Sequence, residues 1–119
     1  MKTTIYGIKN CNTMKKAFAW LDEHGVDYVF HDYKKDGVPL ERLKAWSQQL
    51  GWEKLANSRG PTWRNIPEAE KSGLNEARAI KLLERHSSAI KRPVIDAGGK
   101  LLVGFDEAQY AAVLGARKR

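Results

Sequence analysis

The residue of this chain with the clearest chemical potential is Cys11, the single cysteine among 119 residues. It opens the segment Cys11-Asn12-Thr13-Met14, which has the spacing of a C-x-x-C redox motif with methionine in the place of the second cysteine. Complete reduction of a disulfide needs a second thiol to resolve the mixed disulfide, and this chain holds no second cysteine. The second thiol must therefore come from outside, and glutathione is the abundant thiol of a reducing compartment. We expect glutathione as a co-substrate, with no cofactor bound permanently.

The position of Cys11 favours chemistry over core packing, although a lone cysteine is more often a small core residue. Cys11 follows a predicted strand and precedes a predicted helix. A helix N-terminus offers free backbone N–H groups and the positive end of the helix dipole, which stabilise a thiolate. Lys9 adds a nearby positive charge, and Asn12 is the next residue along the motif. We expect Cys11 to be a nucleophile of lowered pKa, with Lys9 and Asn12 beside the bound glutathione, and Met14 to pack in the core.

Two arginines in predicted loops are candidate anion ligands. Arg59 lies in the segment 57–61, and Arg92 stands directly before Pro93. A guanidinium suits an oxyanion or the carboxylates of glutathione, although each arginine alone would also suit an exposed surface. An X-Pro step before a strand can place a backbone edge beside the cysteine. We therefore include Arg59, Arg92 and Pro93 in the candidate binding set.

The formal net charge of +7 raises the question of nucleic-acid binding. The basic residues are spread along the chain among acidic ones: Lys15, Lys16, Lys34, Lys35, Lys91, Arg92 and the tail 117–119. No aromatic-studded RNA-binding motif or helix-turn-helix pattern occurs among them. The distribution favours a solvated surface that attracts small anions over specific nucleic-acid recognition.

The sequence also bears on metals and on location. His24, His31 and His86 form no Cys/His ligand spacing, so no metal is expected. No apolar stretch is long enough for a signal peptide or a membrane span, and the single cysteine is compatible with a reducing compartment. We expect a cytoplasmic protein that does not bind membranes.

The elements that must position Cys11 begin with a β-α-β unit. Residues 3–6 are β-branched and aromatic and precede Gly7, which is typical of a short strand. A helical face follows, with apolar residues at i, i+3, i+4 and i+7, and stops at Gly25. Residues 28–31 read as a second strand, parallel to the first.

The middle of the chain, about 34–90, predicts an all-helical insertion. Pro39 is expected in the first turn of a helix with one apolar face. Gly51 is expected to end that helix. A loop is expected over 57–61, Pro67 can open a short helix, and Asn75 is an N-cap for a helix running toward His86.

The C-terminal part predicts a β-hairpin and a helix. Strands at 94–96 and 101–103 flank a turn over 97–100, and Asp106 with Gln109 forms a capping box for the last helix. The whole chain is thus expected to be one α/β domain, 1–119, with its core at about 1–33 and 91–119.

Four segments in order, 6–11, 57–60, 91–95 and 103–105, resemble the glutaredoxin-linked arsenate reductase (ArsC) family and its Spx and YffB relatives, with the YffB branch most similar. The resemblance covers nearly the whole chain. It implies a thioredoxin-like core, a cis peptide at Arg92-Pro93 and chemistry at Cys11. It also implies the glutathione-dependent thiol reduction suspected of YffB-like proteins, with glutaredoxin as a further partner.

Three departures from the family pattern concern arsenate. Arg59 and Arg92 match two of the three arginines that grip arsenate in the family, but Phe105 stands where the third would follow Gly104. Gly7 replaces a histidine, and Met14 replaces a serine. We therefore expect a glutathione-dependent thiol-disulfide reductase. The alternatives are an arsenate or other oxyanion reductase, and an Spx-like regulator that binds RNA polymerase, although Spx proteins usually carry the C-x-x-C that this chain lacks.

Overall fold

Two parallel strands and the helix between them form the N-terminal part of the structure, a computed structural model that describes residues 3–115. β1 (Thr3–Gly7) pairs with β2 (Val29–Asp32), and α1 (Asn12–Glu23) connects them. β2 starts one residue later than expected and runs on to Asp32. Gly25 ends the helix with φ of +67°, a conformation that glycine adopts without strain.

The C-terminal part completes the sheet. β3 (Val94–Ala97) lies antiparallel to β1, and β4 (Lys100–Val103) lies antiparallel to β3, which gives the strand order β2-β1-β3-β4. Gly98 and Gly99 form the hairpin turn with positive φ angles of 65° and 99°, as the Gly-Gly pair predicts. α8 (Glu107–Leu114) follows, with the Asp106 side chain accepting a hydrogen bond from the Gln109 N–H.

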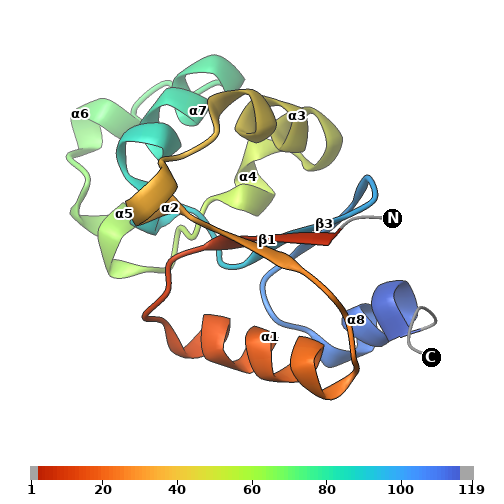
Figure 1. Ribbon diagram of the computed structural model, residues 1–119. Helices are drawn as coiled ribbons and strands as arrows, with labels where there is room; N and C mark the ends of the chain where they lie inside the picture. The colour runs from red at the N-terminus through yellow and green to blue at the C-terminus, as the bar shows by residue number, and fades with distance from the viewer. Residues whose placement is uncertain (1–2, 116–119) are drawn as a thin grey trace. The chain divides into compact units, whose positions relative to one another are not determined.

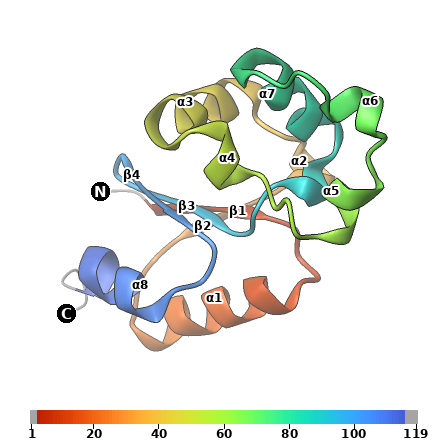
Figure 2. The same ribbon diagram turned by 180° about the vertical axis from the view of Figure 1, so that it is seen from behind.

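α1 and α8 lie on the same face of the sheet (Figures 1 and 2). Apolar side chains from both helices and the strands form one buried core there: Ile5, Met14, Ala17, Trp20, Leu21, Val26, Ile95, Ala97, Leu102, Tyr110 and Leu114. Burial of Met14 agrees with its predicted packing role. The β-α-β unit followed by a β-hairpin and a helix is a thioredoxin-like α/β core, as expected.

The described part of the chain divides into two compact units, one of residues 3–36 with 92–115 and one of residues 37–91. The short α2 (Tyr33–Asp36) belongs to the first unit. The second unit is helical: α3 (Leu40–Leu50), α4 (Trp52–Leu55), α5 (Pro61–Asn65), α6 (Glu68–Lys71), α7 (Glu76–Arg85) and the 3-10 helix η1 (Ser87–Ala89). Asn75 caps α7 as expected, accepting from the Arg78 N–H at 3.0 Å.

Two prolines differ from their predicted places. Pro39 is the N-cap of α3 and lies just outside its first turn. Pro61, expected to end a loop, is instead the first residue of α5, where its fixed φ suits a helix and its missing N–H costs no intrahelical hydrogen bond.

Within residues 3–115, no helix combines the length and the apolar character needed to cross a membrane. The basic tail at 117–119 lies outside the described residues.

Candidate functional site at the start of α1

Cys11 is the N-cap residue of α1. Its backbone is extended (φ −151°, ψ 133°), and its carbonyl accepts the first helical hydrogen bond from the Lys15 N–H at 3.0 Å. The side chain is only partly exposed, because one side of it packs against the apolar core beneath α1. A nucleophile at this position keeps one face open to a substrate.

The pKa of the Cys11 thiol is lowered from its ordinary value. Partial burial raises the pKa, but three polar interactions with the sulfur outweigh it: the Met14 N–H, the Arg92 guanidinium and the Thr13 N–H. The positive charge of Arg92 lowers the pKa further. The thiol forms no capping hydrogen bond of standard geometry, so we regard the two amides of the first turn as electrostatic support for a thiolate.

The pairing of β3 with β1 places Arg92 and Pro93 near Cys11. Tyr6 near the end of β1 pairs with Val94 at the start of β3, so the residues just before Val94 lie beside the loop that leads to Cys11. The Arg92-Pro93 peptide is cis, as the family resemblance implies. Pro93 is buried, and its carbonyl accepts a hydrogen bond from the Gly104 N–H at 2.8 Å. The structure thus brings together Cys11, Arg92 and Pro93 from the predicted site.

Lys9 and Asn12 lie in the same unit, and both are exposed. Asn12 is the first residue of α1. Lys9 is not among the causes that lower the pKa of Cys11, so the cation that acts on the sulfur is Arg92, a different residue from the one the sequence suggested. Lys9 instead lines a neighbouring pocket.

Arg59 belongs to the second unit, in the loop between α4 and α5. A hydrogen bond from the Gly60 N–H to the Asn57 carbonyl (3.0 Å) closes this loop, and the Arg59 side chain is exposed. Within the same unit, an isolated β-bridge joins Ala56, just before the loop, to Ile90. The part of Arg59 in anion binding stays a prediction.

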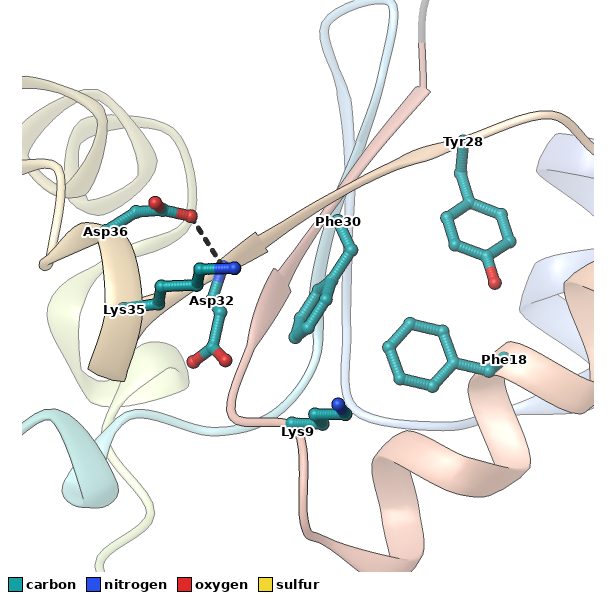
Figure 3. Close-up of a pocket in the computed structure, with 7 residues that line it drawn as sticks. All are labelled: Lys9, Phe18, Tyr28, Phe30, Asp32, Lys35 and Asp36. Atoms are coloured by element: carbon teal, nitrogen blue, oxygen red, sulfur yellow. Dashed lines mark hydrogen bonds between the residues drawn. The ribbon is translucent and has the colours of Figure 1, made fainter.

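A pocket of about 390 Å³ lies beside the β1–α1 loop (Figure 3), and none of the expectations from the sequence includes it. Its lining residues are Lys9, Phe18, Tyr28, Phe30, Asp32, Lys35 and Asp36. The ring centroid of Phe18 lies 5.7 Å from that of Tyr28 and 5.1 Å from that of Phe30. The alternation of Tyr28, Phe30 and Asp32 along one strand face was a signal for it.

Two other features bear on the chemistry of the site. Phe105 packs its ring against Tyr110, with centroids 5.2 Å apart, and offers no hydrogen-bond donor. The family resemblance implies an arginine at this position.

In the part of the chain that the structure describes, no three His, Cys, Asp or Glu side chains gather closely enough to hold a metal ion.

Comparison with known proteins assigns the family. The model of the ArsC family matches residues 6–113. An uncharacterized protein of Haemophilus influenzae is 45% identical over 109 residues, which cover 92% of this chain and 96% of that one. The global transcriptional regulator Spx of Listeria innocua is 24% identical over 118 residues, covering 98% of this chain and 89% of Spx.

A solved structure described as the YffB (PA3664) protein shares the fold with a TM-score of 0.92 and 50% sequence identity, over 95% of this chain and 99% of that one. The family match spans Cys11, Arg59, Arg92 and Phe105, the residues on which the candidate site and its departures rest. This chain belongs to the ArsC family.

Proposed function

We propose that this protein is a glutathione-dependent thiol-disulfide reductase whose nucleophile is Cys11. The observation that carries the proposal is the lowered pKa of Cys11 at the N-cap of α1. A thiolate is the attacking form in disulfide exchange, and a lowered pKa raises its fraction near neutral pH. Membership of the ArsC family supports a redox or oxyanion-reducing role more generally.

The proposed reaction uses two molecules of glutathione. The Cys11 thiolate attacks a substrate disulfide, so that one S–S bond breaks, a mixed disulfide forms, and the departing thiolate takes a proton. One glutathione thiolate then releases the second substrate thiol and leaves Cys11 joined to glutathione. A second glutathione thiolate frees Cys11 as oxidised glutathione forms. Two electrons pass from two glutathiones to the substrate disulfide.

The absence of a second cysteine supports this route over an internal one. Met14 takes the second position of the motif. Its side chain is a fully buried thioether, which cannot form a disulfide, so it supplies no resolving group. In our proposal Lys9, Asn12, Arg59, Arg92 and Pro93 bind glutathione, the arginines through its carboxylates. The setting is a reducing cytoplasm, and glutaredoxin is a partner that can remove glutathione from Cys11.

Mass spectrometry of the protein treated with oxidised glutathione tests the proposal. We expect one added glutathione in the wild type, removed by reduced glutathione or by glutaredoxin, and none in Cys11→Ser. The rate must exceed that of an unactivated model thiol at the same pH. A wild-type protein that forms the adduct no faster than the model thiol would overturn the proposal.

A regulatory function is the second candidate, because relatives named as the global transcriptional regulator Spx align with nearly the whole chain. Under that hypothesis the protein binds RNA polymerase and Cys11 senses oxidation without turning over a substrate. Catalytic production of oxidised glutathione from a disulfide substrate separates the two candidates, since a sensor reacts once per molecule.

A further inference from the structure

The pocket beside the β1–α1 loop has aromatic walls and a charged rim (Figure 3). Phe18 comes from α1, Phe30 comes from β2, and Tyr28 is the residue just before β2. All three rings are only partly buried, although each packs on the core. At about 390 Å³ the pocket falls within the usual size range of ligand sites. It can accept one apolar or aromatic group of a ligand.

The rim carries cations that have no partner within the described residues. The side chains of Lys9 and Lys35 make no hydrogen bond or ion pair there. The two carboxylates of the rim are each engaged by backbone: Asp32 Oδ1 accepts from the Lys34 N–H at 2.9 Å, and Asp36 Oδ2 accepts from the Asp32 N–H at 3.4 Å. Lys9 and Lys35 have no such contact in the described part of the chain, so their ammonium groups remain available to a ligand carboxylate, whose charge they complement.

The pocket is within reach of Cys11. Lys9 precedes Cys11 by two residues, so their Cα atoms lie at most ~7 Å apart. Phe18 follows Cys11 by seven residues on the same helical face, a rise of about 10 Å. A peptide bound through a cysteine at Cys11 can therefore place the side chain of a residue one or two positions away into the pocket.

We propose that this pocket is the specificity subsite for a peptide or protein disulfide substrate, and that it takes an aromatic side chain beside the reacting cysteine, with a neighbouring carboxylate on Lys9 and Lys35. The inference rests on the proposed thiol-disulfide reductase function and adds the substrate class to it. Attack by Cys11 on such a disulfide gives the peptide mixed disulfide and one free peptide thiol, and two glutathiones complete the reduction as above. Lys9 serves the two partners in turn, first the peptide carboxylate and then, once the peptide has left, glutathione.

Four symmetric peptide disulfides test the proposal on the wild-type protein: Ac-Phe-Cys-Glu-NH2, its Ala-Cys-Glu and Phe-Cys-Gln analogues, and Ala-Cys-Gln. Reduction is followed as formation of oxidised glutathione, and the rate with glutathione alone is subtracted for each peptide. We expect kcat/KM to favour Phe over Ala by about tenfold. Glu should exceed Gln by about two- to threefold at low salt, and this second preference should shrink as salt is added.

Variants of the pocket give a second measurement. Phe30→Leu should narrow the preference for Phe, and Lys35→Ala should narrow the preference for Glu. Lys34→Ala is the matched control, because Lys34 is the exposed neighbour of Lys35 and does not line the pocket. If Lys34→Ala and Lys35→Ala showed the same preference for the Glu peptide over the Gln peptide, the proposed contact between Lys35 and the substrate carboxylate would be overturned.

The outcome separates this inference from the function on which it rests. Turnover of all four peptides at equal corrected rates would overturn the subsite and leave the reductase standing. Turnover of none would overturn the reductase. In that event the inert peptide Ac-Phe-Ser-Glu-NH2 tests the pocket directly, and no shift of the Phe18, Tyr28 and Phe30 NMR signals would overturn the subsite as well.

Discussion

The side chain of Met14 lies directly over Gly7, at the point where β1 ends. A Cβ at residue 7 would be 2.7 Å from Met14 Cε and closer still to its sulfur. Met14 is fully buried. The resemblance described above implies other residues at both positions. The contact shows that the glycine makes room for Met14, one turn into α1.

We expect this contact to appear as energetic coupling. Gly7→Ala should destabilise the protein by about 1–3 kcal/mol, because the new methyl group overpacks against Met14. Met14→Ala should cost about 2–5 kcal/mol through the cavity it leaves. The double variant should be more stable than the sum of the two losses predicts, and urea unfolding of all four proteins measures the difference. Additive losses would contradict the contact.

The lowered pKa of Cys11 predicts the pH dependence of its reactivity. The rate of alkylation by iodoacetamide follows the thiolate fraction, so its midpoint should lie below the ~8.5 of an ordinary thiol. Arg92→Gln should move the midpoint upward, because a hydrogen bond and a positive charge are lost. Lys91→Gln, an exposed neighbour, is the control. A wild-type midpoint at or above ~8.5 would show that the site does not activate the sulfur.

The same shift has a consequence for stability. The folded pKa of Cys11 lies below the unfolded one, so the thiolate stabilises the folded state fully only above the unfolded pKa, and this contribution is lost as pH falls through the folded pKa. The free energy of unfolding of the wild type relative to Cys11→Ser should therefore rise with pH across that window. A difference that stays flat, measured by urea unfolding between pH 5 and about 9.5, would contradict the shift.

The two candidate arginines predict a salt-dependent reaction with oxidised glutathione. Arg59→Gln and Arg92→Gln should slow adduct formation more at low salt than at high salt, because contacts to glutathione carboxylates are screened. Rates are compared per thiolate, since Arg92→Gln also changes the thiol pKa. Arg64→Gln, exposed on α5 and outside the candidate set, should match the wild type. If Arg59→Gln and Arg92→Gln formed the adduct as fast as Arg64→Gln, the hypothesis that these two arginines bind the glutathione carboxylates would be rejected.

Arsenate should be a poor substrate even with glutathione and glutaredoxin supplied. Phe105 packs on Tyr110 and cannot donate a hydrogen bond to an oxyanion. Phe105→Arg should restore little activity, because one residue seldom rebuilds a site. Arsenite formation measures the reaction, and efficient turnover by the wild type would instead favour the oxyanion reductase.

Local signals in the sequence determined much of the fold. The hairpin follows from Gly98 and Gly99, which adopt positive φ within a single turn. Asn75 and Asp106 cap their helices through hydrogen bonds that reach only three residues along the chain. α2, α4 and η1 were not predicted as separate helices, because three or four residues are too few to show a helical period. Cys11 was identified as the candidate nucleophile because its strand-to-helix position is also local.

Tertiary structure alone decided what surrounds Cys11. Arg92 acts on the sulfur because β3 pairs antiparallel with β1 in the register that sets Tyr6 opposite Val94. The pocket exists because α1 and β2 bring Phe18 against Tyr28 and Phe30. The fit of Met14 over Gly7 depends on how α1 packs onto the end of β1. Such contacts depend on strand register and helix packing, and the periodicity of residues along the chain predicts neither of them.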